Sequence, residues 1–171
     1  IGSGGQAISV MNVALSIGIS VIAFIDENKV GTKIMGISVI SKQSYLDNYY
    51  NYNLSIAVGD NALREQIYHE YIALLPSVCF PSLVHSSSIV GVGANIGDGT
   101  VLMPLVHVGP NSKVGKFCVL NTSSSIDHDC FMESFSSLAP RVVCGGNVTV
   151  GVRSALSIGS TVKHGIIIGK D

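Results

Sequence analysis

The sequence predicts a mixed fold, in which a small N-terminal α/β domain with a parallel, Rossmann-like sheet precedes a parallel β-helix of hexapeptide repeats. Two observations predict it. Apolar residues recur at every sixth position through the second half of the chain, whereas the first half alternates helical periodicity with short β-branched runs. We assign the two domains to residues 1–75 and 76–171, with Pro76 and Pro81 at the junction.

The composition excludes several classes of protein. The chain is 47% hydrophobic and 12% charged, which favours a packed core over disorder. A formal net charge of -1 gives no electrostatic reason to expect a nucleic-acid partner. No apolar run approaches the roughly 18 to 20 residues of a membrane span, and no signal-peptide pattern is present. We therefore expect a soluble, cytoplasmic protein with reduced cysteines.

The first elements are a Gly-rich turn, a helix and a strand. The turn at residues 1–6 leads into a helix whose apolar face we expect to be buried. That face consists of Ala7, Val10, Met11, Ala14 and Leu15. A β-branched run over residues 21–25 predicts a strand that ends at Asp26. Because the chain begins at Ile1 rather than Met, we expect that part of a first strand is missing from it.

A second strand and helix complete the predicted domain. Residues 30–40 are interpreted as a loop, and residues 54–58 as a strand. Asp60 is interpreted as the N-cap of the following helix, whose apolar residues are Leu63, Ile67, Tyr71 and Leu75. The alternation of strand and helix predicts a parallel sheet.

The repeat of the second half is regular. From Val84 to Ile168 all fifteen positions at six-residue spacing are apolar, which chance would produce on the order of once in a hundred thousand trials. A small or β-branched residue follows four positions later in most repeats, as at Thr100 and Ser112. Both positions should point inward, and three repeats should make one triangular coil of 18 residues. The chain stops in mid-repeat, so the C-terminal cap that such a solenoid needs is expected to be missing.

The Gly-rich turn is a candidate phosphate site. Backbone N–H groups before a helix can face a phosphate, and an acid at the end of the next strand can bind a ribose hydroxyl. Asp26 follows Gly5 by 21 residues, near the expected spacing. The adjacent Gly4 and Gly5 depart from the full G-x-G-x-x-G pattern, which favours a mononucleotide or nucleotide-sugar over a dinucleotide. A purely structural turn stays an alternative.

Residues 121–130 form the densest polar interruption of the repeat. His128 follows the inward Ile126 by two positions, so its side chain should point outward near a corner. An imidazole held by a carboxylate is a suitable general base, and Asp127 and Asp129 are both candidates for that carboxylate. A solvated histidine without a function is the alternative.

Zinc and cysteine chemistry are not expected. The spacings among His85, His107, His128 and His164 are 22, 21 and 36 residues, which shows no close pair and disfavours a zinc site. The remaining histidine, His69, is expected on the exposed side of a helix. The repeat phase points three cysteines inward, away from substrate. These are Cys118, Cys130 and Cys144.

Five segments resemble the PglD/NeuD-type sugar acetyltransferases. They are Gly2-Ser3-Gly4-Gly5 with Asp26-Glu27, Ile56-Ala57-Val58-Gly59-Asp60-Asn61, Leu120-Asn121-Thr122-Ser123-Ser124-Ser125-Ile126-Asp127-His128-Asp129-Cys130, and Cys144-Gly145-Gly146-Asn147-Val148. The resemblance implies a left-handed β-helix, a homotrimer, acetyl-CoA as co-substrate between neighbouring solenoids, no metal, and a nucleotide-sugar on the N-terminal domain.

The resemblance also implies roles for particular residues. His128 matches the general base, Asp129 the acid beside it, and Gly146 a glycine whose amide faces the thioester carbonyl. Asn121 matches a polar residue near the sugar. The residues that match the nucleotide-sugar pocket are Gly5, Asp26, Glu27 and Gly59. The coenzyme groove is matched by Gly146, Ile158 and Gly159.

The expected activity is acetyl-CoA-dependent N-acetylation of a UDP-4-amino-4,6-dideoxy sugar. O-acetylation of sialic acid or another sugar is the alternative, and a non-catalytic scaffold is a further one. Two departures bear on the choice. Gln6 stands where family members commonly have a histidine, and Ser137 stands where many have a second histidine, so contacts with the acceptor are expected to differ.

Overall fold

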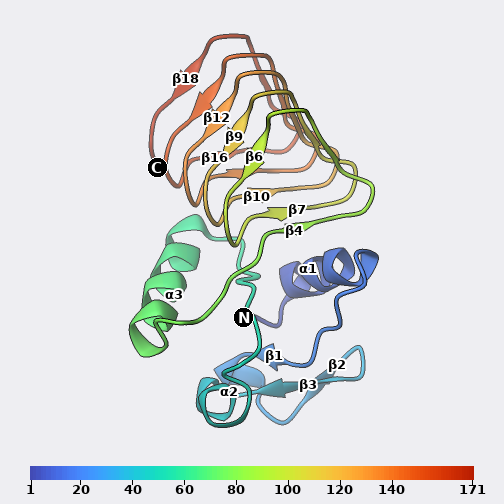
Figure 1. Cartoon of the computed structure of the whole chain (residues 1–171), viewed down its shortest axis with the longest axis vertical. Coiled ribbons are helices and arrows are strands. Elements are labelled where there is room, and N and C mark those ends of the chain that lie inside the picture. Colours follow the sequence, from blue (N-terminus) through green and yellow to red (C-terminus); the bar gives the residue numbers. More distant parts are fainter.

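The computed structural model describes residues 1–171 and divides into an N-terminal α/β unit and a triangular β-helix (Figure 1). The N-terminal elements are α1 (Gly5–Ser16), β1 (Phe24–Ile25), the short 3-10 helix η1 (Glu27–Lys29), β2 (Lys33–Ile34), β3 (Ile37–Ile40), α2 (Lys42–Asn48) and α3 (Asn61–Leu74). None of the helices combines the length and the apolar character that a membrane span requires. The predicted domain boundary between residues 75 and 76 stays a prediction.

Fifteen two-residue strands form the three faces of the β-helix. The first sheet contains β4 (Leu83–Val84), β7 (Val101–Leu102), β10 (Val119–Leu120), β13 (Ser137–Leu138) and β16 (Ala155–Leu156). The second contains β5 (Ile89–Val90), β8 (His107–Val108), β11 (Ser125–Ile126), β14 (Val143–Cys144) and β17 (Thr161–Val162). The third contains β6 (Asn95–Ile96), β9 (Lys113–Val114), β12 (Phe131–Met132), β15 (Thr149–Val150) and β18 (Ile167–Ile168).

The N-terminal sheet is mixed rather than purely parallel. β1 pairs with β3 in parallel, but β2 pairs with β3 in antiparallel orientation. The interpretation of residues 30–40 as a loop was therefore wrong, because a hairpin lies there. It turns through Met35 and Gly36, both of which have positive φ. α2 was not predicted either, since its apolar residues are few and it spans only 7 residues.

The parallel part of the sheet is built around the first two residues. The Gly2 N–H donates to the Ile25 carbonyl at 2.9 Å, and the Ala57 N–H donates to the Ile1 carbonyl at 2.8 Å. Residues 54–58 are thus extended beside Ile1, although they form no regular ladder. Of the strand predicted over residues 21–25, only Phe24 and Ile25 form one; the preceding residues border an apolar cavity of about 350 Å³.

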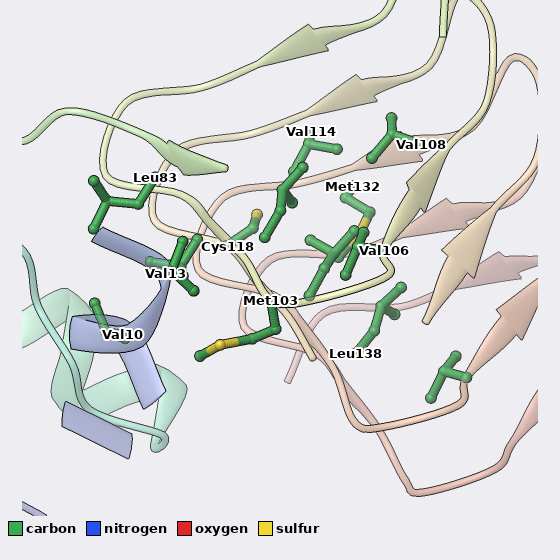
Figure 2. Packing of buried hydrophobic residues seen from close by; sticks show 14 of the residues in the cluster. Val10, Val13, Leu83, Met103, Val106, Val108, Val114, Cys118, Met132 and Leu138 are labelled. Carbon is green, nitrogen blue, oxygen red and sulfur yellow. The ribbon is translucent and has the colours of Figure 1, made fainter. Parts of the chain in front are cut away.

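α1 is buried on a different stripe from the one predicted. Ala7, Val10, Met11 and Ala14 are buried as expected, but Val13 is fully buried and Leu15 is 54% exposed. The reason is that α1 packs against β4 and β7 of the β-helix, while its buried residues also share one apolar cluster with Phe24 and Val39 of its own sheet. Figure 2 shows Val10 and Val13 beside Leu83 and Met103. One apolar cluster therefore runs from α1 into the β-helix.

The repeat predicts the interior of the β-helix. Parallel pairing joins residues 18 apart, as in Ser125 with Val143. The apolar residues predicted to point inward are buried in the central coils, while Val90 in the first coil is 39% exposed because no coil precedes it. Inward hydroxyls bond to turn carbonyls, as Thr100 Oγ1 does to Gly115 O at 2.7 Å. Cys118, Cys130 and Cys144 are buried, as predicted.

In the β-helix, one residue in each turn from Gly93 onward has a left-handed backbone conformation, so these residues recur at every sixth position of the chain. The non-glycine residues of the β-helix in this conformation are Leu105, Asn111, Phe117, Ser123, Asp129, Phe135, Arg141, Asn147, Arg153 and Asp171. Such a conformation is uncommon outside glycine and costs free energy at each position. The stacking of the coils must therefore supply the energy that holds these turns.

A buried arginine joins α3 to the β-helix. The Arg64 side chain donates to the carbonyls of Phe117 at 2.8 Å and Phe135 at 2.9 Å, which belong to successive coils. It also donates to the carbonyls of Val58 at 2.9 Å and Gly59 at 3.2 Å. Burial lowers the pKa of Arg64 to about 10, so the side chain stays charged at neutral pH. Arg64 thereby fixes the Gly59 turn to two coils.

Replacing this side chain should destabilise the protein strongly. Arg64→Met leaves four carbonyl oxygens without their donor, and each unsatisfied buried acceptor costs roughly 1–3 kcal/mol, so we expect a loss of at least about 3 kcal/mol. The free energy of unfolding is measured by urea denaturation. Arg141→Met, at an exposed arginine whose side chain makes no hydrogen bond within the chain, is the matched control. Equal stability of the two variants would contradict the assigned role of Arg64.

Candidate active site

One edge of the triangle carries the candidate catalytic residues. At this edge the chain turns from the second sheet into the third, and residues 18 apart lie above one another because the strands before them are in register. The first residue of each turn at this edge lies above the first residue of the turn in the coil before it. We call the column of these residues the His128 edge. Its members are Val92, Pro110, His128, Gly146 and His164.

The structure selects the carboxylate that contacts the His128 ring. Nδ1 of His128 lies 2.8 Å from Oδ2 of Asp129, whereas Asp127 accepts a hydrogen bond from the His128 main-chain N–H at 2.8 Å. The left-handed conformation of Asp129, with φ 56°, accompanies this arrangement. The hydrogen bond favours the neutral ring protonated at Nδ1 and leaves the Nε2 lone pair free. It is also the main reason that the pKa of His128 is raised.

Gly146 lies directly beside the free ring nitrogen. A Cβ atom at Gly146 would come within 2.5 Å of Nε2 of His128. The Gly146 N–H donates no hydrogen bond within the chain. The equivalent residues in three other turns are Pro104, Pro110 and Pro140, which have no N–H, so the β-helix does not need this donor. An unused donor beside an unused base can bind a carbonyl oxygen that becomes negatively charged.

His164 is a member of this site that the sequence analysis missed. Its ring centroid lies 6.3 Å from that of His128, with the planes inclined by 46°. The interpretation that the histidines form no close pair was therefore wrong for these two. Their spacing of 36 residues is two coils of 18, and this multiple of the repeat was the signal that could have revealed the contact.

Cysteine nucleophiles have no place at the His128 edge. Burial raises the pKa of the Cys118 and Cys130 thiols, and it raises the pKa of Cys144 to about 11. The Cys130 thiol donates to the Gly145 carbonyl with its sulfur 3.2 Å from the oxygen. No three His, Cys, Asp or Glu side chains gather in a way that could hold a metal ion.

The N-terminal candidates lie at one edge of their sheet. Asp26 follows β1, and its carboxylate accepts a hydrogen bond from the Ser3 hydroxyl, which is the main cause of its lowered pKa. Gly5 begins α1, and its N–H donates no hydrogen bond within the chain. Gly59 follows the extended residues 54–58. These three residues all follow extended segments at the carboxyl end of the parallel sheet, where ligands of α/β proteins bind.

Glu27 makes a structural contact through one of its two carboxylate oxygens. Its carboxylate accepts a hydrogen bond from the Lys42 N–H, at the start of α2, at 2.7 Å. This contact anchors α2 beside the turn that contains Asp26.

The remaining candidates lie at a second edge of the β-helix, between the first and second sheets. Asn121 lies there, and its side chain donates to the Leu138 carbonyl at 2.8 Å. Ile158, which is 75% exposed, and Gly159 lie at the same edge two coils later. Thus the structure brings together His128, Asp129 and Gly146. Within the same chain, the N-terminal candidates and the candidates at this second edge lie away from these three residues.

Comparisons with known proteins support the resemblance drawn from the sequence. Residues 1–71 match the family model of the PglD N-terminal domain. Over 150 residues the chain is 27% identical to the GDP-perosamine N-acetyltransferase of Escherichia coli O157:H7. That match covers 85% of this chain but 65% of the relative, so the chain spans slightly less than two thirds of the relative's length.

Solved structures match almost the whole chain. A mutant perosamine N-acetyltransferase from Caulobacter crescentus, in complex with CoA and GDP-perosamine, is 27% identical with a TM-score of 0.93; the match covers 99% of this chain and 81% of that one. The acetyltransferase domain of PglB from Neisseria gonorrhoeae FA1090, in complex with acetyl coenzyme A, is 28% identical with a TM-score of 0.91, over 99% and 82%. The predicted fold class, with its left-handed β-helix, is confirmed.

The closeness of Gly146 to His128 predicts the effect of one methyl group. Gly146→Ala should push the imidazole away from Asp129 and so lower the pKa of His128 toward its ordinary value of about 6.5. Titration of the ring nitrogens by NMR measures this pKa. Gly169→Ala, where a Cβ would meet no atom within 4 Å, is the matched control. A folded Gly146→Ala protein with an unchanged pKa would show that the ring does not lie against Gly146.

Proposed function

We propose, from the premise that the chain belongs to the PglD/NeuD-type sugar acetyltransferases, that it transfers the acetyl group of acetyl-CoA to the amine of a nucleotide-linked amino sugar. The observation that carries the proposal is the pairing of two unused groups. Nε2 of His128 is free to accept a proton, and the adjacent Gly146 N–H is free to donate to an oxyanion.

The reaction proceeds by direct transfer. The acceptor nitrogen attacks the thioester carbonyl carbon while Nε2 of His128 removes a proton from that nitrogen. The Gly146 N–H stabilises the negative charge on the carbonyl oxygen, and Asp129 orients the ring and stabilises the imidazolium. The carbon–sulfur bond then breaks, and the proton held by His128 passes to the departing thiolate, which leaves as CoA.

The relatives favour nitrogen over oxygen as the acceptor atom. Two of them are named as N-acetyltransferases of perosamine, and the solved complex contains GDP-perosamine. The nucleotide in that complex makes a GDP-linked amino sugar the first substrate to test, with the UDP-linked sugar second. We assign Gly5, Asp26 and Gly59, at the carboxyl end of the N-terminal sheet, to the nucleotide-sugar, together with Glu27 in the turn after Asp26.

The active site is assembled between chains of a homotrimer in this proposal. α1 packs on the first sheet, while His128 lies at the edge between the other two sheets. A neighbouring chain must then present its N-terminal unit to His128. The second edge of that neighbouring chain would form the other wall of the acetyl-CoA groove through Ile158 and Gly159, and Asn121 at the same edge would lie near the sugar.

The test is the release of CoA thiol from acetyl-CoA. The full chain is offered a GDP-linked and a UDP-linked 4-amino-4,6-dideoxy sugar in separate reactions, with sialic acid as a third. We expect turnover with an amino sugar, and a rate lower by a factor of about 10² to 10⁴ in His128→Ala. His69→Ala, which removes an exposed imidazole on α3, is the control. Turnover with sialic acid alone, or undiminished turnover by His128→Ala, would contradict the proposal.

The pH dependence tests the partner of His128. Its neutral ring is the active form, so kcat/KM should fall as pH drops through the pKa of His128, which Asp129 raises. Asp129→Asn removes the charge that favours the imidazolium, so the acid limb should move to lower pH while the rate decreases. Asp127→Asn should move it less, because Asp127 bonds to the main chain. An acid limb that does not move in Asp129→Asn would assign the titration to another group.

A further inference from the structure

We propose that His164 binds the acyl donor, forming the second wall of a narrow notch over Gly146 whose first wall is His128. This inference rests on the proposed function, because it places the thioester in that notch. It assigns a role to an imidazole that the general-base mechanism does not use, and it predicts a contact with acetyl-CoA rather than with the sugar.

The two rings lean toward each other. Neighbouring coils of a parallel β-structure lie about 4.8 Å apart, so residues two coils apart are separated by about 9.6 Å along the edge. The ring centroids of His128 and His164 are only 6.3 Å apart. The side chains therefore converge above the intervening coil, where Gly146 lies.

Gly146 makes this convergence possible because it has no side chain, and its main-chain N–H is an available hydrogen-bond donor at the bottom of the notch. A Cβ atom there would lie 2.5 Å from Nε2 of His128, so any larger residue would fill the space. A flat group that touches a ring on each side needs about 7 to 8 Å between the rings, because carbon atoms in contact lie about 3.5–4.0 Å apart. The ring centroids lie 6.3 Å apart, about 1 Å less than this, so the exposed His164 ring must turn outward about its Cα–Cβ bond to admit a planar thioester or amide.

The backbone under His164 is fixed. The Gly165 N–H donates to the Gly146 carbonyl at 3.0 Å. A Cβ atom at Gly145 would lie 2.9 Å from the main-chain nitrogen of His164. The coils thus approach closely at this point and hold His164 in its place over Gly146. The ring itself is exposed and makes no hydrogen bond within the chain, so its N–H is available to a ligand.

The order of groups along the edge indicates which substrate His164 meets. The reacting carbonyl must lie near both Nε2 of His128 and the Gly146 N–H, on the side of His128 toward the later coils. On the other side, Pro110 and Val92 offer no side-chain hydrogen-bond donor. The donor molecule, which carries an amide group a few bonds beyond its thioester, therefore extends over His164, while the acceptor amine approaches His128 from outside the notch.

The experiment compares binding with turnover. Calorimetric titration with CoA gives its Kd, and initial rates give KM for acetyl-CoA and for the amino sugar. In His164→Ala we expect both the Kd of CoA and the KM of acetyl-CoA to rise about five- to tenfold, as for one lost hydrogen bond, with kcat and the sugar KM within about twofold. His164→Gln retains an N–H donor and should keep most of the affinity. Lys163→Ala, at the exposed preceding residue, is the control.

The outcomes separate the two proposals. If His164→Ala binds CoA as tightly as the wild-type protein does, the role of His164 is overturned and the proposed function is left intact. A change in the sugar KM alone would likewise overturn it. A wild-type protein that does not bind CoA would overturn the proposed function, and this inference with it.

Discussion

The in-register stacking of 18-residue coils is the constraint on which the rest of the structure depends. Parallel pairing places every eighteenth residue above the last, so a column of turn residues is determined by one strand register. At one edge this brings His128, Gly146 and His164 together. At another it places the Phe117 and Phe135 carbonyls where a single arginine from α3 reaches both. The candidate chemistry and the attachment of the N-terminal unit thus have the same geometric origin.

The inside of the β-helix could be predicted from the sequence because one energetic term determines it. Burial of an apolar side chain at every sixth residue leaves no other register, and Ile126, Met132 and Leu138 are buried accordingly. Outside the β-helix the same logic fails. Val13 is buried because α1 packs on two surfaces, which a helical stripe in the sequence cannot show. The antiparallel β2 is a two-residue strand and has too little pattern to predict.

The candidate site was predictable in part, for an equally physical reason. His128 and Asp129 are adjacent, so their contact needs only a local turn. The residues alone left Asp127 and Asp129 both open; the resemblance pointed to Asp129, whose left-handed conformation accompanies the observed contact. The contact of His128 with His164 depends on the coil length, and a spacing of 36 residues indicates a contact only after that length is known. Arg64 offered no signal, because main-chain carbonyls are its partners and these are the same for every sequence.

The two parts of the proposed site, the His128 edge and the N-terminal candidates, lie on separate sides of one chain. The central claim is therefore that two chains share each active site. Its most direct test is complementation between two inactive variants. His128→Ala and Asp26→Ala chains with different tags are co-expressed, and oligomers that carry both tags are purified. In the proposed homotrimer each mixed oligomer would contain one interface with both intact halves, so we predict about one third of the wild-type activity. Mixed oligomers no more active than either variant alone would contradict an active site shared between chains.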